Sequence, residues 1–290
     1  MKSRGNSKWT EIGQRLTDRF YSQRYPLQPL VVEATKRLEI GSFGHRVRLG
    51  AFKRPHYAYC VYHSADLAKK LGYEAISVIE FGVAGGNGLA LLEDYAQQVA
   101  AELGIGIEVY GFDNVSGLPT PQDYRDLPYH WKEGFFKMDE EALLNRLRHA
   151  KLVMGDVRDT LGSFLDTHRP APLGAALYDL DFYSSTKPAL ELLHVSEQFR
   201  LPRIFCYFDD IIGSEIELYN DFTGVRLAIA EFNATSDMKV CPAYHLITRQ
   251  HSKPWHHQIF IAHDFEHPKY NTFVSQQDQQ LALRADIAHA

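Results

Sequence analysis

The fold is decided by a strand, a glycine-rich turn and a helix that follow one another in AISVIEFGVAGGNGLALLEDYAQQVAAELG, residues 75–104. Residues 75–81 are mostly apolar along their whole length, as in a strand that is covered on both faces. Apolar residues then recur at helical spacing until Gly104 ends the helix. Glycines crowd residues 82–88 between the two elements, and so small a set of side chains lets a ligand approach the backbone closely.

Composition excludes several classes of protein. The chain has 290 residues, of which 45% are hydrophobic and 23% charged, enough for one large domain with extensions or for two small ones. A net charge of −5 provides no overall basic field for nucleic acid. No apolar run approaches the ~18 residues that a membrane span needs, and three scattered cysteines are typical of reduced thiols. We therefore expect a cytoplasmic protein with neither nucleic-acid nor membrane partners.

Strands and helices alternate through the middle of the chain. The apolar runs that predict strands lie at residues 75–81, 107–113, 151–157, 174–183 and 203–211, with helices at 139–150 and 185–199 among the connections. Two further strand-like runs, 239–249 and 256–265, have no full helix between them and predict an antiparallel pair. The expected fold is α/β, a doubly wound Rossmann-like sheet of seven strands. We expect a helical or lid-like extension at 1–55, the main domain at 56–270 and a tail at 271–290.

Acidic residues and glycines follow every predicted parallel strand. In chain order they are Glu80 and Gly82, Asp113, Gly155 and Asp156, Asp179 and Asp181, and Asp209 and Asp210. In open α/β sheets ligands bind beyond the carboxyl ends of the strands. The regular placement of these residues therefore predicts a binding site along that edge.

The glycine turn lacks the residues that phosphate-binding loops need. It carries no Gly-Lys-Ser/Thr ending, and Leu91 occupies the third glycine position of the dinucleotide fingerprint, which disfavours an NAD-linked dehydrogenase. The spacing of Glu80, Gly82, Gly86 and Gly88 instead suits a ligand with a cationic amino-acid end and an adenosine, namely S-adenosylmethionine. Asp113 is then placed to accept the ribose hydroxyls, and Asp156 to meet the adenine amino group. Alternatively, Asp113 is a turn residue and Asp156 caps the next helix.

Four motifs together resemble a known family. They are EFGVAGGNG (80–88), YGFDNVSGLP (110–119), LYDLDFYSSTKPALELL (177–193) and FDDI (208–211). In this order they resemble class I S-adenosylmethionine-dependent methyltransferases, and more narrowly the macrocin O-methyltransferase family, over about residues 75–215. The resemblance implies methyl transfer to a hydroxyl and a Mg²⁺ ion bound by Asp179, Asp209 and Asp210. Asn114, Val115, Ile211 and residues 201–203 depart from the family pattern, and both terminal regions lie outside the match.

The chemistry of methyl transfer suggests a role for the carboxylates that follow the predicted strands. A hydroxyl acceptor has too high a pKa to ionise near neutral pH, and a divalent cation lowers it. Asp179 and Asp181 are two residues apart on a predicted strand and so share a face, and Asp209 and Asp210 end the neighbouring strand. Carboxylates so close together repel one another unless a cation binds. Asp179 is also the candidate general base. In the alternative without a metal, Asp181 and Asp210 bond to the backbone or to basic side chains.

The sequence thus predicts an S-adenosylmethionine-dependent O-methyltransferase assisted by Mg²⁺. The acceptor is expected to be small and sugar-like or another secondary metabolite, and the chain is a candidate homo-oligomer. The alternatives are a non-catalytic S-adenosylmethionine-binding module and a metal-independent N-methyltransferase. Residues 41–62 contain basic residues and no acid, which fits either a lid over the site or a solvated basic face. His194 is expected to pack rather than to catalyse, and His257 and His263 to lie too far apart on a strand to share an ion.

Overall fold

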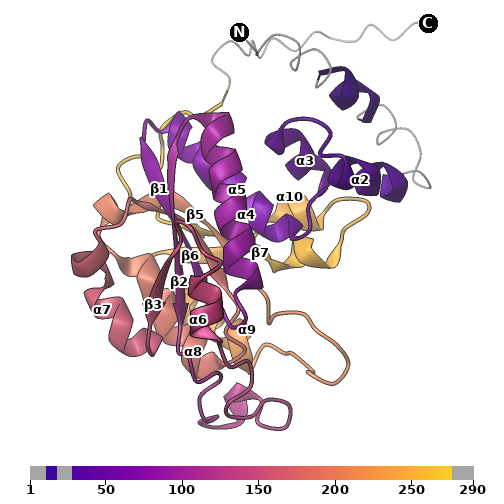
Figure 1. Ribbon diagram of the computed structural model, residues 1–290. Helices are drawn as coiled ribbons and strands as arrows, with labels where there is room; N and C mark the ends of the chain where they lie inside the picture. The colour runs from indigo at the N-terminus through magenta and orange to yellow at the C-terminus, as the bar shows by residue number, and fades with distance from the viewer. Residues whose placement is uncertain (1–10, 18–27, 276–290) are drawn as a thin grey trace, which may run out of the picture.

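The computed structural model describes residues 11–17 and 28–275, and its centre is a twisted sheet of seven strands (Figure 1). The strand order is β3-β2-β1-β4-β5-β7-β6. The strands are β1 (Ala75–Phe81), β2 (Gly106–Asp113), β3 (Lys151–Met154), β4 (Leu173–Tyr178), β5 (Arg200–Phe208), β6 (Lys239–Pro242) and β7 (Ile259–His263). The first five pair in parallel, whereas β7 runs antiparallel to both β5 and β6. This is the topology of class I methyltransferases, and it confirms the predicted fold.

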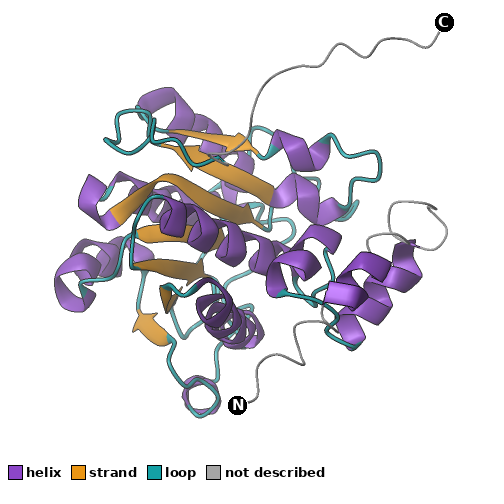
Figure 2. Cartoon of the chain, turned by 90° about the horizontal axis from the view of Figure 1, so that it is seen from above, coloured by secondary structure: helices purple, strands orange, loops and turns teal. Residues whose placement is uncertain are grey.

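Helices cover both faces of the sheet (Figure 2). The α-helices are α2 (Gln28–Arg37), α3 (Phe43–Leu49), α4 (Pro55–Lys70), α5 (Asn87–Leu103), α6 (Glu140–Leu144), α7 (Val157–His168), α8 (Tyr183–Ala189), α9 (Gly224–Thr235) and α10 (Tyr244–Ile247). Short 3₁₀ helices are η2 (Tyr124–Asp126), η3 (Leu190–His194), η4 (Glu197–Phe199) and η5 (Pro254–Gln258). Helices α4 and α5 pack on one face, and α7, α8 and α9 on the other. Residues 11–17 are also helical.

Side chains of β1 alternate between the two layers. Ile76 and Val78 belong to the apolar cluster that includes α4 and α5, whereas Ile79 and Phe81 belong to the cluster on the opposite face. This alternation is the period of two of an extended strand. It places Glu80 in the same row as Ile76 and Val78, so that a carboxylate points into the α4–α5 layer.

The parallel register aligns the carboxyl ends of the central strands. Beyond each strand end, one more backbone hydrogen bond joins the next residue to a neighbouring strand: Gly82 N to Phe112 O (2.9 Å), Gly155 N to Asp113 O (2.9 Å), Asp179 N to Phe81 O (2.9 Å) and Asp209 N to Tyr178 O (3.0 Å). The residues that follow the strands therefore lie along one edge. The loops after β2 and β5 extend from this edge at the lower end of the molecule in Figure 1.

Several predicted elements are shorter in the structure. The strand predicted at 174–183 is β4, which already ends at Tyr178. Asp179 and Asp181 therefore lie beyond the strand, and Asp181 has φ +58°, so the two do not share a strand face as expected. The run 239–249 is a strand only as far as Pro242, and 256–265 begins as the 3₁₀ helix η5, which contains His257. Helix 139–150 reduces to α6, and helix 185–199 divides into α8 and two 3₁₀ turns.

The remaining general expectations were those for membranes and cysteines. Within the described residues, no helix is long and apolar enough to cross a membrane. All three cysteines are free thiols, and Cys60 and Cys206 are buried. Most of the tail, residues 276–290, and parts of the N-terminal extension lie outside the described residues.

Gly82 follows β1 and lies close to the backbone of Asp179, which follows β4. It has φ +83°, and a Cβ atom there would lie 1.7 Å from the backbone oxygen of Asp179. We expect Gly82→Ala to lower the free energy of unfolding by about 3 kcal/mol, because both the φ angle and the contact are strained. Gly72 is a matched control, with φ +77° and no atom within 4 Å of the added Cβ. Urea unfolding of both variants is the measurement, and equal losses would contradict this role of the close approach.

Candidate active site at the strand ends

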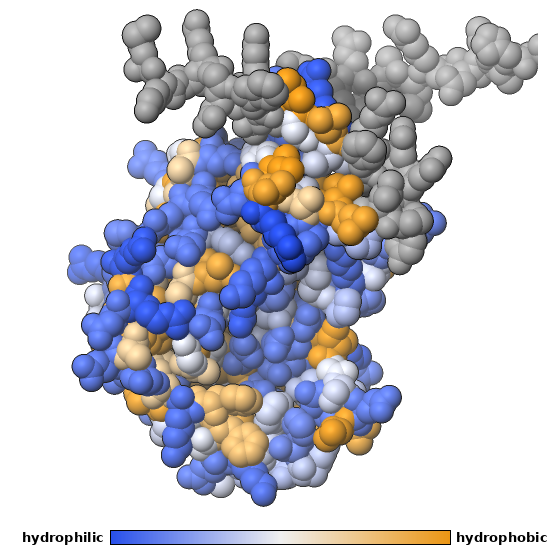
Figure 3. Space-filling model, turned by 45° about the vertical axis from the view of Figure 1, so that its right-hand side comes forward, coloured by the Kyte–Doolittle hydropathy of each residue, from blue (hydrophilic) through white to orange (hydrophobic). Residues whose placement is uncertain are grey.

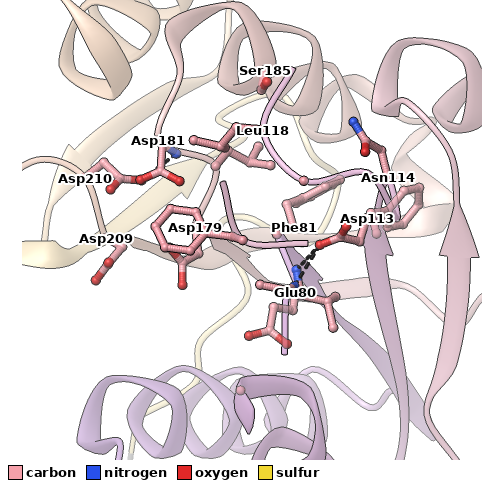
Figure 4. A pocket seen from close by; sticks show the side chains of 18 of the residues that line it. Glu80, Phe81, Asp113, Asn114, Leu118, Asp179, Asp181, Ser185, Asp209 and Asp210 are labelled. Atoms are coloured by element: carbon pink, nitrogen blue, oxygen red, sulfur yellow. Dashed lines mark hydrogen bonds between the residues drawn. The ribbon is translucent and has the colours of Figure 1, made fainter. Parts of the chain in front are cut away.

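A cavity of about 450 Å³ opens at the carboxyl ends of the parallel strands. Its walls combine the glycine turn, the strand-end acids and the loops that follow β2 and β5. The charged side chains that line it are Arg54, Glu80, Asp113, Asp156, Asp179, Asp181, Asp209, Asp210 and Glu217. Figure 4 shows Asp179, Asp181, Asp209 and Asp210 gathered on one side and Asp113 with Asn114 on the other. The cavity therefore has two parts, and a single cation faces many carboxylates.

Asp113 holds the glycine turn in place. Its Oδ2 accepts hydrogen bonds from the backbone N–H groups of Val83 (2.7 Å) and Ala84 (2.8 Å), and Figure 4 draws such a bond as a dashed line. Burial raises the pKa of Asp113, and these backbone donors oppose the rise. Gly86 begins α5 with φ +71°, and its missing Cβ leaves room for Leu143 of α6. The turn is thus fixed by the Asp113 carboxylate, which also lines the cavity.

Glu80 is fully buried at the entrance of the turn. Tyr57 of α4 donates a hydrogen bond of 2.5 Å to its Oε1. A Cβ at Gly88 would lie 2.0 Å from the same oxygen, so only glycine fits opposite this carboxylate. Oε2 of Glu80 has no hydrogen-bond partner within the described part of the chain. Burial raises the pKa of Glu80 to about 7, against the effects of Tyr57 and Arg54. A buried acceptor without a donor is costly, and a cationic ligand would satisfy it.

Arg54 is the basic residue that faces this acidic cavity. Its Nη1 donates to the Tyr57 hydroxyl over 3.1 Å, and its guanidinium lies 5.0 Å from the centre of the Tyr57 ring. Burial lowers the pKa of Arg54, but Tyr57, Glu80 and Asp179 raise it, and the net shift is upward. Next to it, His56 stacks on Tyr207 with 4.2 Å between ring centres. Burial and then Arg54 lower the pKa of His56 to about 3, so this imidazole is neutral.

Asp179, Asp209 and Asp210 converge on one point. Each offers a carboxylate oxygen, and the three oxygens lie within 4.8 Å of one another. Burial raises the pKa of Asp179, and Asp210 and Asp209 raise it further by repulsion. Three hard oxygen donors in so small a volume match the ligands that Mg²⁺ prefers. These are the residues for which the sequence predicted a metal site, and the binding of a metal stays a prediction.

Donors from neighbouring elements hold two of these carboxylates. Tyr207 donates to Oδ1 of Asp209, which also accepts from Nε2 of Gln258 over 3.1 Å. Asp210 accepts from the backbone N–H of Asp181 (2.8 Å) and from the hydroxyl of Tyr219 (3.2 Å). Such contacts fix the carboxylates in place but leave most of their lone pairs unsatisfied.

Asp181 is held protonated beside Asp210. Burial and the neighbouring carboxylates of Asp210 and Asp179 raise the pKa of Asp181 to about 10. Its protonated carboxyl is then a hydrogen-bond donor toward Asp210, whose own pKa is raised by burial and by Asp209. Asp181 therefore bonds to Asp210, whereas the alternative without a metal had it bonded to the backbone or to basic side chains.

Asp156 lines the cavity but is engaged elsewhere. It caps α7 by accepting from the N–H of Arg158 over 2.9 Å, and its carboxylate forms an ion pair of 2.5 Å with the Arg158 guanidinium. This is the capping role that the sequence left open as an alternative. Contact with an adenine amino group stays a prediction that requires Asp156 to retain a lone pair for it.

Two loops form the mouth of the cavity. They are residues 114–138, after β2, and residues 211–223, after β5, and they meet where the Tyr129 hydroxyl donates to the Glu217 carbonyl over 2.6 Å. Trp131 and Phe136 line the cavity from the first loop. Exposed apolar side chains follow on both loops, for example Phe136 (50% exposed) and Leu218 (63%). Figure 3 shows orange patches at the lower end of the molecule, where these loops lie.

Sequence reasoning missed the residues that support the acids. Arg54, Tyr57, Tyr207, Tyr219 and Gln258 come from four separate segments and carry no motif of their own. Tyr57 lies on α4, far from Glu80 in the sequence, and its hydroxyl nevertheless reaches Glu80. His194 lies outside the cavity, bonded to Glu191 and Ser236, as expected for a packed residue.

Comparisons with known proteins give fold likenesses only. Neither a protein-family model nor a curated protein sequence matches the chain. A solved structure of the calicheamicin methyltransferase CalS11 aligns with 17% identity and a TM-score of 0.48, covering 91% of this chain and 94% of that one. The plantazolicin methyltransferase BpumL, in complex with SAH, aligns with 12% identity and a TM-score of 0.32, covering 81% of this chain and 80% of that one. The fold assignment rests on the strand order described above.

Repulsion within the acid cluster predicts a stabilising substitution. We expect Asp179→Asn to raise the free energy of unfolding by about 1 kcal/mol at neutral pH in metal-free buffer. A raised native pKa means that the folded chain binds more protons than the unfolded chain, so ionisation destabilises the fold as pH rises above the usual Asp range of about 4. The gain should therefore vanish at acid pH. The measurement is chemical unfolding in the presence of a chelator, and Asp166→Asn, at an exposed position, is the control. A loss of stability in Asp179→Asn at neutral pH would contradict the repulsion.

Proposed function

We propose that this protein is an S-adenosylmethionine-dependent O-methyltransferase, assisted by Mg²⁺ and acting on a hydroxyl of a small acceptor. The observation that carries the proposal is one cavity with two chemically different halves. One half presents a buried, unpartnered carboxylate oxygen of Glu80 beside a glycine turn. The other half presents three converging aspartates.

The glycine half fits a cationic nucleoside without phosphate. Glu80 supplies negative charge for the amino-acid end of the donor, and the turn has few side chains to hinder its approach. Asp113 has one oxygen bonded to the turn, and the second is the proposed acceptor for ribose hydroxyls. The density of acids disfavours a phosphate group here, because phosphate would be repelled.

The aspartate half fits a divalent cation. Asp179, Asp209 and Asp210 are the proposed ligands, and Tyr207, Gln258 and Tyr219 orient two of them. The ion would supply the positive charge that lowers the pKa of an acceptor hydroxyl. Asp179 lies at the junction with the glycine half, since its backbone bonds to Phe81 at the end of β1. It is the proposed base for the acceptor proton.

The acceptor enters between the two mouth loops in this proposal. Trp131 and Phe136 offer flat apolar surfaces, and the aspartates offer polar contacts deeper inside. Such a combination suits a small molecule with a hydroxylated, sugar-like part and an apolar remainder. Membership of the macrocin O-methyltransferase family is a proposal that rests on the four sequence motifs alone.

Binding of S-adenosylmethionine is expected to depend on pH through Glu80. Because the cationic ligand favours the ionised carboxylate and the pKa of Glu80 is about 7, affinity should fall by about fivefold between roughly pH 8 and pH 6. Calorimetry with the full chain is the measurement. Glu80→Gln should weaken binding and flatten its pH dependence, whereas Glu191→Gln, at an exposed position, should change neither. An absence of any binding at millimolar ligand would remove the proposed function altogether.

Methyl transfer is expected to need the aspartate cluster. Asp209→Asn should lower kcat by at least about a hundredfold, because the acceptor hydroxyl would keep its proton. Affinity for S-adenosylmethionine should stay within about twofold, since Asp209 lies in the other half of the cavity. The assay is the release of S-adenosylhomocysteine with a panel of sugar and phenol acceptors, with and without Mg²⁺. Asp221→Asn, on the loop after β5, is the control.

Two outcomes would replace this proposal with its alternatives. Binding of the donor without turnover of any acceptor, and without a Mg²⁺-dependent thermal shift, would indicate a non-catalytic binding module. Full activity in the presence of chelator, retained in Asp209→Asn, would indicate a metal-independent enzyme.

A further inference from the structure

Two stretches of this acidic protein contain no acid at all. They are residues 41–62 and 238–263, which together carry seven of the 31 lysines and arginines and seven of the 14 histidines. The first stretch contains α3 and the start of α4, and the second runs from β6 to β7. Arg54 of the first stretch faces the main cavity. Most of the other basic residues do not, so the proposed function leaves them without a role.

The two stretches meet in a second cleft. It has a volume of about 310 Å³ and shares no lining residue with the main cavity. One wall is the start of α2 and the end of α3, and the other is the turn from α10 into η5, which lies beside α3 in Figure 1. The lining residues are Gln28, Arg48, Leu49, Gly50, Arg249, Gln250, His251, Lys253, Trp255 and His256. Among the described residues that line this cleft, three are cations and none is an acid.

Gly50 brings the two walls together. It ends α3 with φ +66°, and a Cβ at this position would lie 3.5 Å from the Trp255 ring and 3.8 Å from Nζ of Lys253. The ammonium group of Lys253 is therefore held against the wall formed by α3. The buried ring of Trp255 lies against the same position.

Two of the three cations that line the cleft have no ion-pair partner within the described residues. Neither Arg249 nor Lys253 forms an ion pair there, although ion pairs are found at many other basic residues. Burial and then the charge of Arg249 lower the pKa of Lys253. Two cations that repel one another in a half-enclosed cleft cost free energy, and a bound anion would offset that cost.

The cleft also contains neutral hydrogen-bond donors. Trp255 is only 9% exposed, and its indole Nε1 is buried and has no hydrogen-bond partner in the described structure. His256 accepts from the backbone N–H of Lys253 at Nδ1 over 3.0 Å, and burial lowers its pKa to about 4. It is therefore neutral, with its proton on Nε2. A buried donor such as the Trp255 indole is normally bonded, so its presence beside two cations points to an acceptor-rich ligand.

We propose that this cleft is a binding site for a small phosphate-type anion, separate from the methyl-transfer cavity. Arg249 and Lys253 supply the charge, with Arg48 on the opposite wall, and the Trp255 indole supplies a neutral donor. A guanidinium matches two phosphate oxygens at once, and a lysine adds a point charge. The enclosed volume suits a phosphate or diphosphate group on a small molecule. A nucleic-acid strand is a poorer match because the chain is acidic overall.

Titration calorimetry with inorganic pyrophosphate and phosphate tests this site. The full chain in a low-salt buffer without other oxyanions should bind pyrophosphate saturably at millimolar concentration or below. The double variant Arg249→Gln/Lys253→Gln should bind at least about tenfold more weakly, because two charge-assisted contacts are lost. Arg226→Gln, an exposed arginine paired with Asp221, should bind as the unaltered protein does. Trp255→Phe keeps the ring packing but removes the N–H, and it should weaken binding by about threefold.

Other results would overturn the proposal. One is an absence of binding at tens of millimolar pyrophosphate. Another is a loss in Arg54→Gln with none in the double variant, because this would place the anion in the main cavity. A third is far tighter binding of a single-stranded oligonucleotide that the double variant abolishes, because the ligand would then be a polymer. Circular dichroism of each variant shows whether a loss of binding merely reflects a loss of fold. None of these binding measurements depends on methyl-transfer activity, so they test the anion site separately from the proposed function.

Discussion

The repulsion among carboxylates at one edge of the sheet is the constraint on which the rest of the site depends. The register of the central strands fixes where these acids lie, because each residue beyond a strand end bonds to the backbone of a neighbouring strand. The backbone positions of Asp179 and Asp209 are therefore set by the sheet. Carboxylates held within 4.8 Å must take up protons, recruit donors or bind a cation.

The protein uses the first two means at different positions. Asp181 stays protonated and bonds to Asp210, and tyrosine hydroxyls and Gln258 reach Asp209 and Asp210 from other elements. Glu80 is the exception, since Tyr57 satisfies one oxygen and the other has no partner within the described chain. The incomplete satisfaction of Glu80 and of the aspartates is the reason for proposing a cationic donor and a divalent ion as ligands of this cavity.

Acidic and basic residues gather in different parts of the molecule, which the net charge of −5 does not reveal. The strand ends collect acids with Arg54 facing them, whereas two acid-free stretches meet in a separate cleft. A cavity that repels phosphate and a cleft that attracts it thus coexist in one chain. The element η5 connects them, because Trp255 lines the cleft and Gln258 bonds to Asp209. This arrangement places an anion site within one short helix of the aspartate cluster.

The alternation of strands and helices, and the edge at which the acids gather, could be predicted from the sequence alone, whereas the bounds of several helices could not. Strand-end residues such as Asp113, Asp179 and Asp209 were predictable because parallel strands present their carboxyl ends together, whatever the details of packing. Only the tertiary structure decided how each acid is used. It ended β4 at Tyr178 and turned Asp181 toward Asp210, engaged Asp156 with Arg158, and brought Tyr57 and Gln258 to the site from distant segments. Local periodicity specifies strands and helices, but hydrogen-bond partners between remote segments depend on how whole layers pack.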